Sequence, residues 1–130
     1  MREKYIVSLL QIKNLENNLV REVAHMWFTG WPQSGVPNEE KLFISFIFDV
    51  RTTRKQLRAK GPIIVHCSPG TGRTGTYIAC DLCMRQFDDQ KVIDIPKTVY
   101  RIRRERAGAV QTREQYAFIY RVSLDLLQLN

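Results

Sequence analysis

Hydrophobic residues in the first third of the chain gather in two runs, at positions 5–12 and 20–28. Both runs are rich in Val, Ile, Leu and aromatic residues, and the segment 15–18 between them carries two Asn and one Glu. Two such runs joined by a short polar connection predict a β-hairpin. Positions 30–38 then hold two Gly, two Pro and one Ser, which predicts an ordered loop.

After this loop, hydrophobic residues recur at helical spacing up to a break at Gly61-Pro62. Asn38 is the expected N-cap of this helix, and Glu39 and Glu40 suit the positive end of its dipole. Basic residues crowd the C-terminal part of the segment, as is typical of helix ends. The apolar face that we expect to be buried consists of Leu42, Phe43, Phe46, Ile47 and Val50.

The second half of the chain predicts one short strand and three further helices. Positions 63–65 read Ile-Ile-Val and are uniformly apolar, as in strands buried on both faces. A helix is expected from about 74 to 88, and another, with Pro96 in its first turn, ends near 106. Thr112 is the expected N-cap of the last helix. The apolar side of that helix carries Tyr116, Ile119, Tyr120, Leu124 and Leu127.

Composition restricts the class of protein. With 130 residues, of which 44% are hydrophobic and 10% aromatic, the chain is neither disordered, nor collagen-like, nor a disulfide-rich mini-protein. This length fits one domain, residues 1–130, that buries roughly two-thirds of its surface. The order of the predicted elements favours the α/β class, in which α-helices flank a twisted mixed β-sheet.

The net positive charge of the chain indicates an anionic partner. Lys and Arg number 20 against 13 Asp and Glu, which gives a net charge of +7. The basic residues concentrate at positions 51–60 and 101–106, for which a solvated helix face is the first interpretation. Steering of an acidic phosphopeptide and a nucleic-acid patch are the alternatives. The aromatics at 116–120 have helical spacing, so base stacking and a nucleic-acid partner are not expected.

The cysteines indicate a reducing compartment, because there are three of them and the chain shows no signal peptide and no membrane segment. Cys80 and Cys83 have no second pair of metal ligands nearby in sequence, so we expect them in the core and not on zinc. His25, on the second predicted strand, is interpreted as a surface or satisfied core residue.

The most informative segment begins where the short apolar strand is predicted to end, at Cys67, and carries Gly at 70, 72 and 75. A tight Gly-rich loop can turn successive backbone N–H groups toward one point, which makes an anion-binding nest. The loop leads into a helix N-terminus, which adds partial positive charge at that point. Arg73, at the start of the helix, can grip two phosphate oxygens with its planar guanidinium.

The same field should lower the pKa of the Cys67 thiol from its usual value of about 8.5. A thiolate beside an anion-binding nest suits attack on phosphorus through a covalent phosphocysteine intermediate. A Cys before a Gly-rich turn is, taken alone, usually a small buried residue. The glycines alone resemble a dinucleotide motif, but they lack the acidic residue that holds the ribose. The full string of strand, His-Cys, five residues, Arg-Thr-Gly and helix is a far more specific signal of such a site than the cysteine or the glycines alone.

The string His66-Cys67-(five residues)-Arg73-Thr74-Gly75 resembles the signature of the protein-tyrosine phosphatase family, in its phosphotyrosine-specific branch. Positions 31–37, Trp-Pro-Gln-Ser-Gly-Val-Pro, are similar to the mobile acid loop of that family. Positions 111–116, Gln-Thr-Arg-Glu-Gln-Tyr, are similar to its glutamine loop. The three segments occur in the family's order, and the resemblance corresponds to the C-terminal half of the family's catalytic domain.

The resemblance implies a two-step hydrolysis of phosphotyrosine on proteins, without metal or cofactor. In this reaction Cys67 is the nucleophile, Arg73 binds phosphate and stabilises the transition state, and Thr74 hydrogen-bonds the sulfur. Gln111 positions the hydrolytic water, with Gln115 in support. The other implied site residues are His66, which orients the loop, Trp31 and Pro32, which hinge and shape the acid loop, and Ser68, Pro69, Gly70, Thr71 and Gly72, which surround the phosphate.

Two residues depart from the family pattern. Gln33 stands where the acid loop has Asp, whose task is to protonate the leaving phenol oxygen. Glutamine cannot give up a proton, and loss of a general acid typically costs ~10²–10⁴-fold in rate. Pro69 stands where the family commonly has Ala, and proline has no N–H. The nest loses a donor if that N–H faces the phosphate.

The chain is also shorter than the family's domain, whose N-terminal half carries the tyrosine that stacks on the substrate ring. We therefore expect exposed apolar surface, which the missing half or a partner covers. The predicted function is hydrolysis of phosphotyrosine, slowed by Gln33, in the cytoplasm or on the cytosolic side of a membrane receptor. The alternatives are a phosphotyrosine-binding pseudophosphatase and a basic anion- or RNA-binding module.

Overall fold

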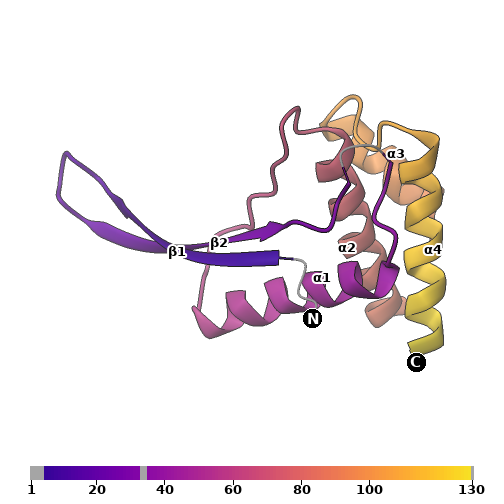
Figure 1. Ribbon diagram of the computed structural model, residues 1–130, viewed down its shortest axis with the longest axis horizontal. Coiled ribbons are helices and arrows are strands. Elements are labelled where there is room, and N and C mark those ends of the chain that lie inside the picture. Colours follow the sequence, from indigo (N-terminus) through magenta and orange to yellow (C-terminus); the bar gives the residue numbers. More distant parts are fainter. Residues whose placement is uncertain (1–4, 33–34, 130) are drawn as a thin grey trace.

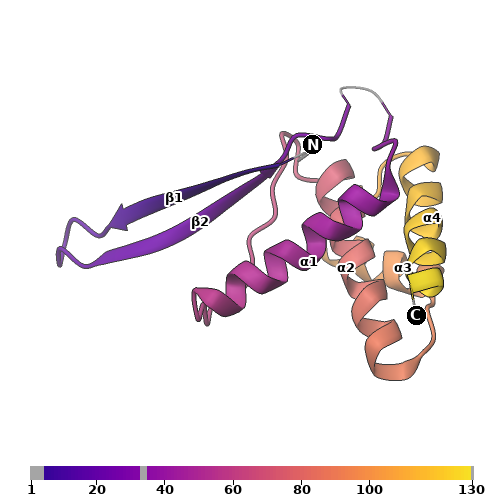
Figure 2. The ribbon, with the colours of Figure 1, turned by 60° about the horizontal axis from the view of Figure 1, so that its bottom comes forward.

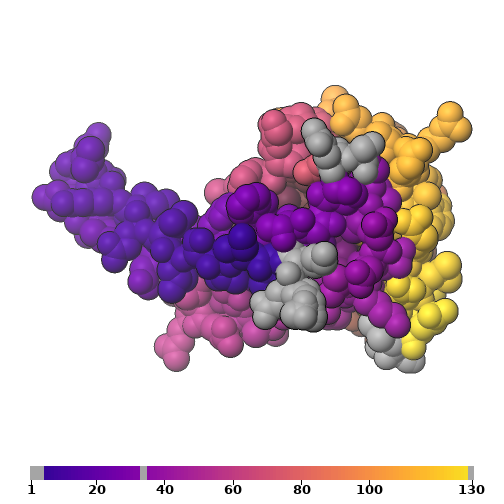
Figure 3. All heavy atoms as spheres, viewed as in Figure 1, coloured from indigo at the N-terminus to yellow at the C-terminus, as the bar shows by residue number. Residues whose placement is uncertain are grey.

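The computed structural model of the chain describes residues 5–32 and 35–129. It begins with β1, Tyr5–Lys13, and β2, Val20–Phe28, which pair antiparallel along their whole length. Between them, Asn14 Oδ1 accepts the Glu16 N–H, and Asn18 adopts the left-handed conformation at φ +60°. The predicted hairpin is therefore confirmed, and it extends as an arm from the helical body (Figure 1, Figure 3).

The four predicted helices are confirmed, with ends that differ by a few residues. They are α1, Glu40–Gln56, α2, Gly72–Gln90, α3, Ile95–Glu105, and α4, Arg113–Leu129. The prediction that Asn38 caps the first helix is wrong, because Glu39 occupies the N-cap position. The same helix ends before the predicted break, because Arg58 adopts the left-handed conformation at φ +53°.

Local hydrogen bonds explain where α3 and α4 begin. The Asp94 carboxylate accepts the Lys97 N–H at 3.0 Å, and Pro96 lies in the first turn of α3 as predicted. At α4, Thr112 Oγ1 accepts the Gln115 N–H and Gln115 Oε1 accepts the Thr112 N–H, both at 3.1 Å. This reciprocal pair is a capping box, so the predicted cap Thr112 is confirmed.

The core forms where α2 packs against α3 and α4 and where α1 packs against α4 (Figure 2). Phe43 of α1 is fully buried at its centre. Its ring meets the rings of Phe28, Trp31, Tyr77 and Phe118 edge to face, with centroid distances of 5.2–6.0 Å. The hairpin, the loop after it and three helices therefore converge on one side chain, which fixes the loop relative to α2.

The predicted buried strand at positions 63–65 is wrong. No strand forms there, and Ile64 is 86% exposed. The α/β class is confirmed, but within the described residues the sheet is a two-stranded antiparallel one and not a mixed one. A strand is held by backbone hydrogen bonds to a neighbour. β1 and β2 pair only with each other, so the apolar run has no sheet to join.

The expected exposed apolar surface is found on the arm. Leu15 at its tip is 84% exposed, and large hydrophobic side chains of both strands are exposed as well. They are Ile6, Val7, Leu9, Leu10, Ile12, Val20 and Trp27. Hydrophobic residues on both faces of a two-stranded ribbon cannot all be buried by the helices, because the arm contacts the body only near its base (Figure 3).

Candidate active site

Cys67 opens the phosphate loop, which we define as residues 67–73. Gly70 has φ +72°, a conformation that favours glycine, and turns the chain sharply before α2 begins. In the first turn of α2, the Thr74 hydroxyl donates a hydrogen bond to Cys67 Sγ at 3.0 Å. The backbone at Gly70, Thr71 and Thr74 also hydrogen-bonds the sulfur. The loop therefore surrounds the sulfur with donors, as the glycine spacing predicts.

These hydrogen bonds set the charge state of Cys67. Partial burial by itself raises the pKa of the thiol. The hydrogen bonds from the Thr74 hydroxyl and from the backbone of the loop oppose this effect and prevail, so the pKa of Cys67 lies below its ordinary value. The N-terminus of α2 acts in the same direction. More of this thiol is therefore ionised at neutral pH than in a free cysteine.

Arg73 reaches from the phosphate loop to the acid loop, residues 31–37. Its Nη2 donates to the Pro32 carbonyl at 3.0 Å, and its guanidinium carbon lies 5.9 Å from the centroid of the Trp31 ring. The Trp31 indole N–H in turn donates to the Gly35 carbonyl at 3.0 Å. A guanidinium has five N–H donors, so Arg73 can join the two loops and also grip an anion.

Gln111 and Gln115 lie against the beginning of α2. A Cβ atom at Gly72 would be 2.8 Å from Gln115 Nε2 and 3.1 Å from Gln111 Oε1, so the two amides approach the glycine closely. Gln115 is buried, and its Oε1 accepts the Gln111 N–H at 2.7 Å in addition to its bond to Thr112. The structure therefore brings both glutamines to the phosphate loop, one residue from Arg73.

His66, directly before Cys67, contacts a residue far away in sequence. Its Nε2 lies 3.3 Å from Nε2 of His25 on β2, and the two rings are stacked with their centroids 5.5 Å apart. One ring must donate and the other accept, because a neutral imidazole has one of each. His25 is a satisfied residue, as expected. Its role as the link between the hairpin and the phosphate loop carries no signal in the sequence.

Two arginines of the basic segment 101–106 donate hydrogen bonds to backbone carbonyls, one of which belongs to the phosphate loop. Arg106 Nη2 donates to the Pro69 carbonyl at 3.3 Å. Arg103 donates to the two carbonyls of residues 109–110 at 2.9 and 2.7 Å. The interpretation of this segment as a solvated helix face missed both contacts. No sequence pattern could have shown them, because the acceptors are backbone carbonyls, which every residue has.

The sequence model of the family described as Protein-tyrosine phosphatase matches residues 1–125. The chain belongs to the protein-tyrosine phosphatase family. It is 39% identical over 117 residues to receptor-type tyrosine-protein phosphatase eta of Mus musculus, an alignment that covers 90% of this chain and 10% of that protein.

Two further protein-tyrosine phosphatases align with most of the chain. Tyrosine-protein phosphatase non-receptor type 9 of Rattus norvegicus is 37% identical over 135 residues, which cover 95% of this chain and 23% of that protein. Receptor-type tyrosine-protein phosphatase S of Gallus gallus is 37% identical over 124 residues, which cover 95% of this chain and 8% of that protein. The chain therefore spans less than a quarter of the length of these relatives.

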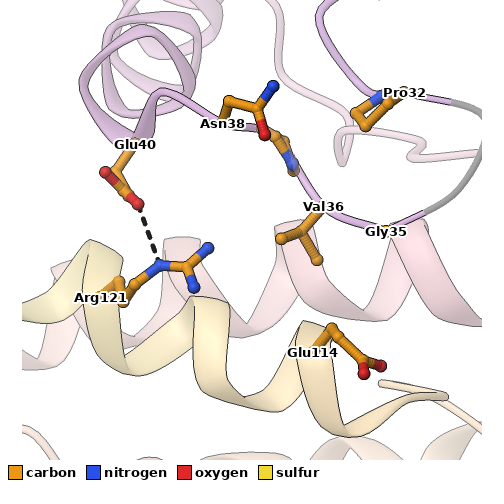
Figure 4. A pocket seen from close by; sticks show the side chains of 8 residues that line it. Pro32, Gly35, Val36, Asn38, Glu40, Glu114 and Arg121 are labelled. Carbon is orange, nitrogen blue, oxygen red and sulfur yellow. Dashed lines mark hydrogen bonds and ion pairs between the residues drawn. The ribbon is translucent and has the colours of Figure 1, made fainter.

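Gln33, which the sequence resemblance leads us to expect at the position of the acid, lies outside the described residues. Two carboxylates that follow it in sequence, Glu40 and Asp49, are engaged elsewhere. Glu40 forms an ion pair with Arg121 of α4 at 2.9 Å (Figure 4), and Asp49 accepts a hydrogen bond from the Tyr5 hydroxyl. Neither carboxylate is therefore placed to act at Cys67.

Figure 4 shows the hollow beside the acid loop, of about 680 Å³, into which the Glu40–Arg121 pair points. Its other lining residues are Pro32, Gly35, Val36, Pro37, Asn38 and Glu114. None of them belongs to the phosphate loop. The hollow separates the acid loop from α4, while the ion pair across it ties the beginning of α1 to α4.

Among the described residues, no group of three or more His, Cys, Asp and Glu side chains is placed to hold a metal ion. Cys80 and Cys83 are buried in the core, as expected, and burial raises the pKa of both thiols. Within residues 5–32 and 35–129, no helix has the length and apolar character needed to cross a membrane.

Proposed function

We propose that this chain hydrolyses phosphotyrosine on proteins through a phosphocysteine intermediate, with Cys67 as the nucleophile. The observation that carries the proposal is the set of hydrogen-bond donors around Cys67 Sγ, which lowers the pKa of the thiol. Membership of the protein-tyrosine phosphatase family supports the same chemistry. Relatives include receptor-type and non-receptor enzymes, so the proposed location is the cytoplasm or the cytosolic side of a membrane receptor.

In the first proposed step, the Cys67 thiolate attacks phosphorus, so that an S–P bond forms and the P–O bond to the tyrosine ring breaks. The N–H groups of the phosphate loop and the Arg73 guanidinium hold the three remaining phosphate oxygens. The phenol oxygen, with a pKa of about 10, leaves with the electron pair. It takes its proton from water, because Gln33 cannot supply one, and this step is therefore slow.

In the second step, water attacks the phosphorus of the phosphocysteine. Gln111, which the buried Gln115 holds beside the loop, orients this water. An O–P bond forms and the S–P bond breaks, so that sulfur leaves as a thiolate and the Thr74 hydroxyl stabilises it. Both protons of the water depart with the inorganic phosphate, which balances the reaction without a metal or a cofactor.

The test compares a phosphotyrosine peptide with an activated aryl phosphate, whose phenol leaves without a proton. We expect a burst of phenol from the activated substrate that is abolished in Cys67→Ser, and slow turnover of the peptide. Gln33→Asp restores the acid, and turnover of the peptide should rise by roughly 10²-fold or more, with little change on the activated substrate.

Two results would contradict this scheme. The absence of a burst in the parent chain argues against Cys67 as the nucleophile. An equal response of both substrates to Gln33→Asp argues against leaving-group protonation as the slow step, because only the peptide needs the proton.

The replacement of the acid by Gln33 also favours a second function, that of a phosphotyrosine-binding pseudophosphatase. The donors of the phosphate loop and Arg73 bind a phosphate whether or not an acid is present. Saturable binding of a phosphotyrosine peptide, with no release of phosphate from either substrate, would indicate this function in place of hydrolysis.

A further inference from the structure

A second group of cations lies away from the phosphate loop, at the C-terminal end of α1. Figure 1 shows this end of α1 at the lower edge of the molecule, whereas α2 begins at the upper edge. A groove of about 380 Å³ lies there. Its charged lining consists of Arg51, Arg54, Lys55, Arg58 and Arg85, opposed by Asp88 and Asp89. Five cationic side chains therefore face two carboxylates.

Two of these cations already have carboxylate partners. Arg51 pairs with Asp81 at 2.6 Å and with Asp88 at 3.8 Å, and Arg85 pairs with Asp81 at 3.0 Å. The other three form no ion pair within the part of the chain that the structure describes, namely Arg54, Lys55 and Arg58. The groove therefore presents three cations without an ion pair in that part of the chain, against the single remaining carboxylate of Asp89.

Arg54 supplies an independent observation. Its Nη2 donates to the Gly61 carbonyl at 2.7 Å, which fixes the guanidinium at the edge of the groove. Its Nε is buried and, among the described residues, is the buried side-chain polar atom that lacks a hydrogen-bond partner. Folded proteins normally satisfy such donors. Arg54 therefore lines the groove and keeps one donor without a partner among the described residues.

The helix dipole explains only part of this cluster. Cations in the last turn of a helix are favoured by the partial negative charge there, which accounts for Arg54 and Lys55. Arg58 lies two residues beyond the end of α1, so the same partial charge also favours a cation at this position. The unpartnered Nε of Arg54 has no explanation of this kind.

We propose that this groove binds a small ligand with clustered phosphate groups, such as a polyphosphorylated inositol or the same group as a lipid headgroup. Arginine guanidinium groups match phosphate oxygens in pairs, and Lys55 adds a compact charge. The carboxylates of Asp88 and Asp89 select against a ligand with a single negative charge. Ile63 and Ala59, which also line the groove, offer an apolar contact for the carbon ring.

The test uses the 130-residue chain with Arg73→Ala, which disables the phosphate loop, and inositol hexakisphosphate as the probe in calorimetry. We expect saturable binding that weakens with added salt. Lys55→Gln/Arg58→Gln should weaken it roughly tenfold or more, since two of the three cations without an ion pair are lost. Arg101→Gln/Arg104→Gln, which removes the same charge from the exposed face of α3, should change it less than about twofold.

Equal losses in the two double variants would overturn the proposal, because they would show attraction to net charge alone. Absence of saturable binding in the Arg73→Ala chain would overturn it as well. Arg54→Lys keeps the charge but removes the Nε donor, so binding several-fold weaker than in the parent supports the assigned geometry. These readouts do not involve hydrolysis, so they leave the proposed function untouched.

Vesicles distinguish the two sources of the ligand. Phosphatidylcholine vesicles with and without phosphatidylinositol bisphosphate are sedimented with the Arg73→Ala chain. Retention only on the phosphorylated vesicles, and its loss in Lys55→Gln/Arg58→Gln, supports a lipid headgroup. Binding of inositol hexakisphosphate without retention on vesicles supports the free compound.

Discussion

Removal of the Thr74 hydroxyl tests the charge state of Cys67 most directly. This hydroxyl donates to the sulfur at 3.0 Å, and a hydrogen bond to a charged group contributes about 1.5–3 kcal/mol. The sulfur is only partly buried, so solvent screening favours the lower end, about 1.5 kcal/mol. Since about 1.36 kcal/mol corresponds to a factor of ten, Thr74→Ala should lower the ionisation constant of the Cys67 thiol about tenfold.

The assay is alkylation of Cys67 by iodoacetamide, followed by mass spectrometry across a pH series. Only the thiolate reacts, so the rate reports its population. The sign follows from the hydrogen bond: it favours the charged form, so its loss raises the pKa of Cys67. Thr74→Ala should therefore react about tenfold more slowly than the parent on the acid side of both titration curves and approach the parent's rate in alkali.

Thr74→Ser is the matched control, because it keeps the hydroxyl and should react like the parent. Cys80 and Cys83 are internal controls, since both are buried and should stay unmodified in all variants. A Thr74→Ala chain with the parent's rate and pH profile would refute the reasoning. If Thr74→Ser is slowed as much as Thr74→Ala, the effect comes from packing and not from the hydrogen bond.

Two further substitutions test the site and the core. Gly72→Ala pushes aside the amide of Gln115, so turnover of an activated aryl phosphate should fall roughly ten- to a hundredfold while the burst remains. In the control, Gly75→Ala, the new Cβ would lie 2.6 Å from the Val110 backbone nitrogen, so this variant should lose stability instead. A loss of turnover in Gly75→Ala together with a loss of stability in Gly72→Ala would count against the placement of the glutamines. Phe43→Ala should cost about 3–5 kcal/mol in urea unfolding, and a loss below about 1 kcal/mol would contradict the aromatic cluster.

The sequence alone determined the elements whose causes are local. The capping box of Thr112 and Gln115 and the first-turn Pro96 depend on residues three or four apart, so the starts of these helices could be predicted. The ring of donors around Cys67 is local in the same sense, because a short Gly-containing loop and the next helix turn create it. The placement of Gln33 at the acid position comes from sequence alone and stays a prediction.

Only the tertiary structure decided which distant residues meet. The contact of His66 with His25 and the bond from Arg73 to the Pro32 carbonyl each join residues 41 positions apart. The apolar run at 63–65 forms no strand, because strand formation depends on a neighbouring edge and not on the run itself. Periodicity indicated the buried side of α1 but not that of α4, where Tyr120, Leu124 and Leu127 are exposed. Backbone carbonyls and sheet edges carry no residue-specific signal. The partners of these groups are therefore set only when the whole chain packs.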